Sequence, residues 1–203
     1  MKLVGLCGMS GSGKTHLIRS VKNQLKENVS VLSFDNYYKP IHQQKKDSNG
    51  FENFDLPEGI DIQKFLMDLE LLKSGSPVFL KVYQFNKPDA KDEVIKIESA
   101  PVIILEGIFV FYFQSIFTQL DYRIFIDATL EKTLERRLQR DKEERGLNDE
   151  MVMYQWEQHA LPGYNRYIYP YRHQADLLLD NENNNEAAAG TLISALNHLI
   201  LQK

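Results

Sequence analysis

The chain has 203 residues, 43% of them hydrophobic, and a formal net charge of -4 at pH 7. We expect one domain over residues 1–203, and the mild acidity argues against nucleic-acid or membrane binding, so any phosphate site is local. The single cysteine, Cys7, excludes an intramolecular disulfide, and the lack of a signal peptide or a transmembrane-length apolar run favours a cytoplasmic protein.

The first predicted elements are a strand over Leu3–Cys7, a glycine-rich loop and a helix over Lys14–Lys26. The order of strand, loop and helix matches a phosphate-binding loop, whose N–H groups and helix dipole surround anionic oxygens. Lys14 is expected to reach the β- and γ-phosphates, and the Thr15 hydroxyl to hold Mg²⁺. The pattern predicts a nucleoside-triphosphate site made of Gly8, Ser10, Gly11, Ser12, Gly13, Lys14 and Thr15.

The rest of the chain alternates strands with helices, which predicts an α/β fold: a parallel sheet flanked by helices. Apolar runs predict further strands over Val29–Phe34, Val102–Leu105, Tyr122–Ile126 and Asp176–Leu179. Helical spacing predicts helices over Ile60–Leu72, Leu130–Glu144, Asp149–Tyr167 and Glu186–Leu201. A small hairpin over residues 78–97 is predicted from the runs Val78–Phe85 and Val94–Ile97.

Two stretches between these elements stand out. The polar segment Asn36–Glu58 is longer than a plain connection, and a loop of that length in a compact domain is usually functional. The aromatic-rich stretch Ile108–Phe117 favours core packing or a contact between subunits of a homo-oligomer.

Three carboxylates stand where predicted strands end: Asp35, Glu106 and Asp127. Ligands gather at the carboxyl ends of parallel strands, and phosphoryl transfer needs a metal ligand beyond Thr15 and a carboxylate near the acceptor hydroxyl. Glu106 is the candidate Mg²⁺ partner and Asp35 the candidate base. Asp127 is expected to cap the helix that begins near Thr129.

Four arginines lie on or next to the charged helix predicted from Leu130, several of them on one face. Beside a phosphate loop they favour a helical lid over residues 130–146 that clamps the triphosphate and spreads transition-state charge. Arg136 and Arg140 are the candidates for catalysis, Arg137 for the nucleotide and Arg145 for the substrate. The alternative is a solvated helix whose arginines pair with its own carboxylates.

The motifs resemble, in their order, the uridine kinase branch of the phosphoribulokinase and uridine kinase family. The matching stretches are the phosphate loop, 33–38, 53–58, Val82-Tyr83, 105–108, 136–141 and 144–146. The resemblance implies a P-loop kinase that moves the γ-phosphate of ATP, with Mg²⁺, to the 5′-hydroxyl of a small nucleoside-like molecule, with uridine or cytidine as the first expectation.

The same resemblance implies roles for individual residues. Asp35 would activate the sugar hydroxyl, and Asp55 would hold the ribose hydroxyls. Tyr38, Tyr83 and Phe85 would line the nucleoside site, with the hairpin over 78–97 as its wall.

Four positions depart from the family's pattern: Pro88, Ala90, Thr133 and Met151 replace a His, two Arg and a Gln. Because buried polar readout gives strong discrimination, losing it changes or relaxes selectivity. Another riboside or a phosphorylated sugar therefore stays open as the acceptor.

Two other classes of protein compete with a kinase. A GTP switch is suggested by the short patterns Asn86-Lys87-Pro88-Asp89 and Asp47-Ser48-Asn49-Gly50, although Asp47 does not follow a strand as a switch aspartate would. The second is an ATP-binding regulatory protein without catalysis, which the intact Lys14, Thr15, Asp35 and Glu106 argue against.

Overall fold

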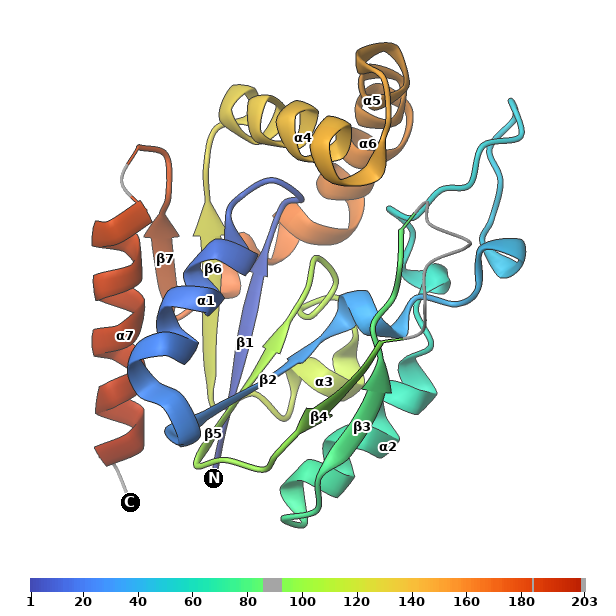
Figure 1. Ribbon diagram of the computed structural model, residues 1–203. Coiled ribbons are helices and arrows are strands. Elements are labelled where there is room, and N and C mark those ends of the chain that lie inside the picture. Colours follow the sequence, from blue (N-terminus) through green and yellow to red (C-terminus); the bar gives the residue numbers. More distant parts are fainter. Residues whose placement is uncertain (86–92, 184, 202–203) are drawn as a thin grey trace.

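A five-stranded parallel sheet, in the order β2-β5-β1-β6-β7, forms the centre of the computed structural model, which describes residues 1–85, 93–183 and 185–201 (Figure 1). The strands are β1 (Lys2–Gly8), β2 (Val29–Ser33), β5 (Val102–Glu106), β6 (Tyr122–Asp127) and β7 (Leu177–Asp180). The predicted parallel sheet is confirmed, because β1 pairs in parallel with both β5 and β6.

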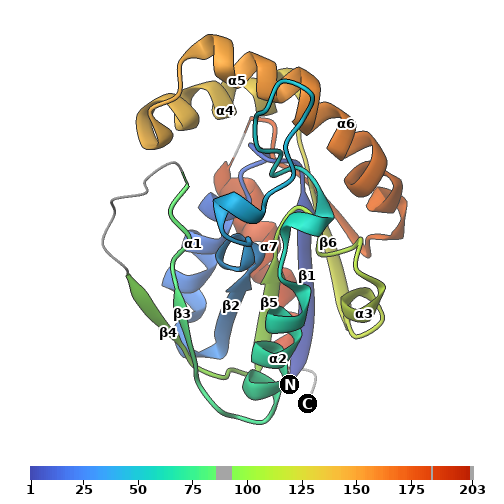
Figure 2. The same cartoon turned by 90° about the vertical axis from the view of Figure 1, so that its right-hand side faces the viewer.

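Helices cover both faces of this sheet and its carboxyl end (Figures 1 and 2). One face carries α1 (Lys14–Leu25) and α7 (Asn185–Leu201), and the other carries α2 (Ile62–Lys73) and α3 (Gln114–Phe117). Above the strand ends lie α4 (Leu130–Arg145), α5 (Asp149–Gln155) and α6 (Leu161–Gly163). In the part of the chain that the structure describes, no helix is long and apolar enough to cross a membrane.

The two helical layers each enclose a separate apolar core. In β1, Leu3 and Cys7 join the core beneath α2, whereas Val4 and Leu6 join the core beneath α1 and α7. Successive side chains of a strand point to opposite faces, so a strand covered on both sides must be apolar throughout. This explains the apolar run Val102–Leu105 of β5, which is buried throughout and ends at the buried Glu106.

The predicted hairpin is present, with a shorter first strand than expected. β3 (Val78–Lys81) pairs antiparallel with β4 (Val94–Ile97). After β3 the Val82 N–H still bonds to the Glu93 carbonyl at 2.8 Å, but the Tyr83 backbone N–H donates to the Asn36 side chain at 3.2 Å. The segment through Phe85 is thus drawn toward the end of β2.

The single helix predicted over Asp149–Tyr167 is instead a chain of helical turns of different pitch. Two π-helical turns, Trp156–Ala160 and Tyr164–Ile168, flank α6, and a 3₁₀ segment, Tyr169–Gln174, follows. The Leu161 N–H bonds to the Trp156 carbonyl, five residues back, next to a proline that has no N–H to donate. Trp156, the only tryptophan of the sequence, is buried in this layer.

One smaller expectation is corrected. Thr129, not Asp127, caps α4 by accepting from the Lys132 N–H, while the Asp127 carboxylate binds Arg172 at 2.6 and 2.9 Å.

In the stretch Ile108–Phe117, the residues Phe109, Val110 and Phe111 are fully buried within the chain's own core. Core packing therefore accounts for most of that stretch.

Candidate active site

The phosphate loop closes around its own lysine. The Lys14 ammonium is buried and donates to the carbonyls of Gly8 (2.9 Å) and Met9 (3.1 Å). The Ser12 N–H bonds back to Met9 at 3.0 Å, whereas the buried Ser12 hydroxyl has no hydrogen-bond partner in the described structure. A positive group and an unpartnered hydroxyl suit the oxygens of a nucleotide phosphate.

The glycines of the loop are required by backbone geometry and by close neighbours. Gly11 and Gly13 have φ angles of 89° and 96°, which side-chain-bearing residues rarely adopt. A Cβ atom at Gly11 would collide with the Thr133 carbonyl, and one at Gly13 with the Asn181 amide. The loop therefore lies directly beneath α4 and the turn after β7.

The carboxylates at the strand ends meet at this loop. Glu106 ends β5 and accepts from the Ser33 hydroxyl at 2.7 Å, while Asp35 is exposed in the 3₁₀ turn that follows β2. Burial, and then the nearby Asp35 charge, raise the pKa of Glu106 to about 7. Thr15 and Glu106 line the same cavity, and their hydroxyl and carboxylate oxygens are of the kind that would suit Mg²⁺.

One cavity of about 520 Å³ collects most of the residues predicted for the site. Its lining includes Ser10, Gly11, Gly13, Lys14, Thr15, Asp35, Tyr38, Asp55, Tyr83, Phe85, Glu106, Arg136, Arg137, Arg140 and Arg145. Gly8 and Ser12 complete the loop behind it. The phosphate loop and the expected acceptor residues therefore share a single space.

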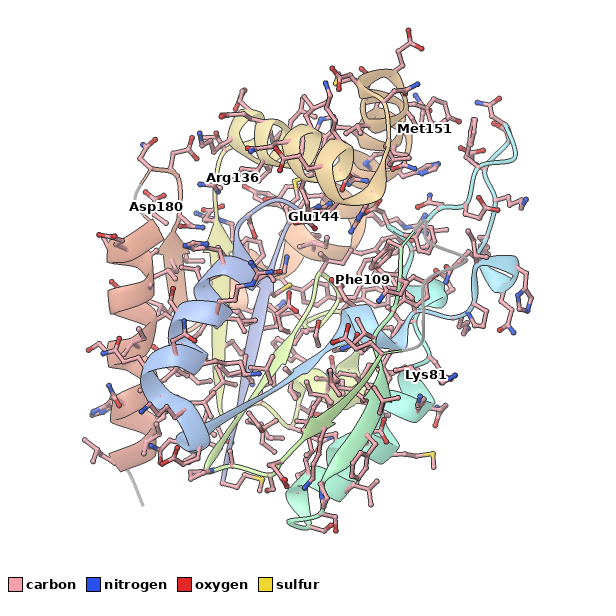
Figure 3. All side chains as sticks on the ribbon, viewed as in Figure 1. Lys81, Phe109, Arg136, Glu144, Met151 and Asp180 are labelled. Atoms are coloured by element: carbon pink, nitrogen blue, oxygen red, sulfur yellow. The ribbon has the colours of Figure 1, made fainter. Side chains whose placement is uncertain are left out.

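The arginines of α4 are arranged around a buried carboxylate. Asp141 is fully buried and contacts Arg137 (3.2 Å), Arg140 (2.8 Å) and Arg145 (3.3 Å). Arg136 reaches away from them, toward the carbonyls of Asn181 (2.8 Å) and Ser12 (3.5 Å). Figure 3 shows Arg136 and Glu144 along α4, with Asp180 near Arg136 at the end of β7.

These arginines face two different parts of the cavity. Arg140 donates to the Ser10 hydroxyl of the phosphate loop at 3.4 Å. Arg137 instead lies 3.8 Å from Asp55, and the Arg145 guanidinium stacks 4.4 Å above the Phe85 ring. The nucleotide role of Arg137 stays a prediction, since Arg137 contacts Asp55, which is on the side of the cavity where the acceptor is expected.

The acceptor side of the cavity is a cluster of aromatic rings around one carboxylate. Phe85 lies 4.7 Å from the Tyr83 ring and 5.4 Å from the Tyr38 ring. The Tyr38 hydroxyl donates to the Phe54 carbonyl at 3.0 Å, and burial raises the pKa of Tyr38 well above its ordinary value. Asp55 is nearly buried beside these rings. Flat apolar faces next to a carboxylate suit a base joined to a sugar.

Sequence reasoning missed several residues of this site. The Phe54 ring lies 5.5 Å from the Phe85 ring, and the Gln155 side chain accepts a hydrogen bond from Arg137. The Asn36 side chain accepts from the Tyr83 N–H. The Asn181 side chain holds the phosphate loop by donating to the Ser12 carbonyl at 2.7 Å. The position of Phe54, next to Asp55 in a matching stretch, was a usable signal. Asn181 lies in an asparagine-rich turn, which indicates no more than a loop.

The positions that depart from the family's pattern are partly accounted for. Thr133 is fully buried, and its hydroxyl donates to the Leu130 carbonyl at 2.9 Å. Met151 lies in the first turn of α5, where its N–H is capped by Asn148 (Figure 3). Pro88 and Ala90 lie outside the described residues.

The patterns that suggested a GTP switch find no support at this site. Residues 86–89 also lie outside the described residues. The Asp47 carboxylate binds Tyr154 and His159, and Asp47 does not line the cavity.

The model of one protein family, described as "Phosphoribulokinase / Uridine kinase family", matches residues 3–188. A protein named uridine kinase from Borrelia duttonii is 34% identical over 200 residues, which cover 98% of this chain and 96% of that protein. A protein named uridine-cytidine kinase B from Dictyostelium discoideum is 29% identical over 202 residues, covering 99% and 83% of the two chains.

A solved structure from Silicibacter sp. TM1040 has a similar fold. It aligns with a TM-score of 0.63 over 87% of this chain and 88% of that chain, at 24% identity. At that identity the likeness concerns the fold alone, and it agrees with the predicted sheet and its helical layers.

Proposed function

The chain belongs to the phosphoribulokinase and uridine kinase family, and on that premise we propose that it is a nucleoside kinase acting on the 5′-hydroxyl, with uridine and cytidine as first acceptors. The observation that carries the proposal is the single cavity that joins the phosphate loop to Asp35, Asp55 and the aromatic rings.

Each part of the cavity has a chemical task in this proposal. The loop N–H groups, Lys14, Thr15 and Glu106 would hold ATP with Mg²⁺, and the bound nucleotide would supply the phosphoryl group. Asp35 takes the proton from the attacking hydroxyl, and Asp55 accepts hydrogen bonds from the ribose hydroxyls. Arg136 and Arg140, which contact loop residues, face the place where negative charge develops.

The identity of the acceptor is tested first. Purified protein with ATP and Mg²⁺ is assayed for ADP release with uridine, cytidine, other ribosides and phosphorylated pentoses. Rapid release with uridine or cytidine supports the proposal as stated. Activity with another riboside or a sugar phosphate alone would keep the kinase and replace its acceptor. ATP binding without turnover on any acceptor would favour a regulatory protein.

The role of Asp35 is tested by Asp35→Asn, which keeps the side-chain shape and removes the base. Turnover should fall at least about a hundredfold, the lower range for loss of a general base, while the Kd for ATP stays unchanged. Asp121→Asn is the control, because Asp121 bonds to the Leu3 N–H at the opposite end of the sheet. A variant with wild-type turnover would show that Asp35 is not the base.

A further inference from the structure

Residues 45–53 form a small hairpin that projects from the long segment after β2. The Asp47 N–H bonds to the Phe51 carbonyl at 2.9 Å, and the Asn53 N–H to the Lys45 carbonyl at 2.7 Å. Gly50 closes the turn with a φ angle of 86°. The tip contains the Asp47–Gly50 pattern, for which the proposed kinase chemistry has no use.

The Asp47 carboxylate connects this hairpin to the helical layer above the sheet. One of its oxygens accepts from the backbone N–H groups of Asn49 (2.9 Å) and Phe51 (3.0 Å). The other lies 2.6 Å from the Tyr154 hydroxyl, which donates to it, and 2.7 Å from His159 Nε2. We call Asp47, Tyr154 and His159 the clasp.

The clasp joins a buried histidine to two partly buried side chains. His159, in the π-helical turn after α5, is only 2% exposed, and a buried imidazole is costly without a partner. The Tyr154 ring packs 5.1 Å from Phe51, and its hydroxyl also accepts from the Asn49 amide at 2.7 Å. The Tyr154 hydroxyl, and then His159, hold the pKa of Asp47 well below its usual range.

The chain runs directly from the clasp into the acceptor side of the cavity. The Asn53 side chain accepts from the Asp55 N–H at 2.9 Å. The Asp55 carbonyl lies 2.6 Å from where a Cβ atom of Gly163 would stand, and Gly163 is in the same helical layer as His159. The segment from Asp47 to Asp55 is therefore held against that layer at both ends.

We propose that the clasp is a positioning device that fixes Asp55 for acceptor binding without touching the acceptor itself. This inference rests on the proposed nucleoside kinase function. While the clasp is intact, it holds the hairpin against the helices, so Asp55 stays 3.8 Å from Arg137 and next to the aromatic rings. Pre-organised binding groups gain affinity because less ordering is needed when the acceptor arrives.

The kinetic test uses Asp47→Asn and the milder Tyr154→Phe, which keeps the ring on Phe51. Both should raise the KM for the nucleoside about tenfold, as expected for losing a charge-assisted hydrogen bond, and leave the KM for ATP unchanged. The control Asp176→Asn breaks comparable bonds to Arg123 outside the acceptor region and should change neither constant. Equal effects on both KM values, or none, would overturn the clasp's role.

A second measurement needs no substrate and separates this inference from the proposed function. Amide hydrogen exchange at residues 53–55 should be faster in Tyr154→Phe than in the wild type, with the exchange of the β1 amides unchanged. Unchanged exchange at 53–55 would overturn the clasp even if the wild type is an active nucleoside kinase. A wild type that phosphorylates no nucleoside would refute the proposed function and the acceptor role of the clasp, and faster exchange would then support only its holding of the segment.

Discussion

Asp141 shows how a single buried side chain organises the basic surface of the site. Burial opposes its ionisation, but the positive charges of Arg140, Arg145 and Arg137 outweigh that effect and lower its pKa. In return, its carboxylate lets three guanidinium groups lie close together although they repel one another. The arginines are thus held in place before any phosphate arrives.

Asp141→Asn should therefore destabilise the protein, because it removes the closer charged partner of buried Arg137 and leaves only the Asp55 carboxylate, at 3.8 Å. We expect the free energy of unfolding to fall by about 3 kcal/mol, as when a buried ion pair loses one member. Urea denaturation measures this. Asp149→Asn is the control: it breaks the exposed pair with Lys142 at 3.6 Å and should cost less than about 1 kcal/mol. Equal losses for both variants would contradict the buried role of Asp141.

At the scale of single residues, sequence patterns predicted a residue's place in the site where that place depends on neighbours close in the sequence. Lys14 and Thr15 were predictable because their spacing from the glycines determines where they lie. Asn181 was not, since its contact with the Ser12 carbonyl joins residues 169 positions apart in sequence. Nothing in the local sequence of the asparagine-rich turn indicates that neighbour.

At the scale of elements, two glycines differ in their place in a helix: Gly146 ends α4, and Gly190 lies within α7. Gly146 ends α4 in the left-handed conformation, with a φ angle of 66°, and its N–H bonds to the Asp141 carbonyl. Gly190 lies inside α7, without a positive φ angle. Neither glycine has a neighbour within 4 Å of an added Cβ atom, so only backbone conformation distinguishes them.

Substitution by alanine should therefore have opposite effects at these two positions. Gly146→Ala should lower the free energy of unfolding by about 1 kcal/mol, because alanine is strained in the left-handed region. Gly190→Ala should raise it by about 0.5–1 kcal/mol, because alanine loses less entropy in a helix. Thermal or urea unfolding of the matched pair checks both signs, and shifts of the same sign would contradict this account.

Most elements followed from periodicity, and the exceptions have tertiary causes. The first hairpin strand is short because Asn36, 47 residues away, takes the Tyr83 N–H. The π-helical turns after α5 escaped prediction because a helical period in the sequence does not reveal a local change of pitch. Both irregularities lie beside the acceptor side of the cavity, where tertiary contacts overrode local preference.

At the scale of the whole molecule, the sheet buries its only thiol at the centre of the fold. Cys7 in β1 is fully buried, and its thiol donates to the Ile108 carbonyl at 3.3 Å. Burial raises the pKa of Cys7 to about 11. At neutral pH the thiol is therefore both protonated and shielded from solvent, although it lies one residue before the phosphate loop.

Labelling of Cys7 by a thiol reagent such as Ellman's reagent should require opening of the sheet, because the exposed thiolate is the reactive form. We expect no labelling of the native protein over minutes at pH 7–8 and one equivalent after unfolding in urea. The labelling rate should follow the unfolding transition seen by circular dichroism. Complete labelling of the native protein within seconds would contradict the buried position of Cys7.

The single tryptophan provides a second signal, its intrinsic fluorescence. Trp156 lies in the π-helical turn that also carries His159, and its side chain belongs to the same apolar core as Cys7 of β1. A buried indole emits at shorter wavelength than one in water, so a red shift would report water reaching this helical layer. The molecule thus carries two intrinsic labels, an optical one above the strand ends and a chemical one within the sheet. Comparing their responses to denaturant would reveal whether the layer over the active site detaches before the sheet comes apart.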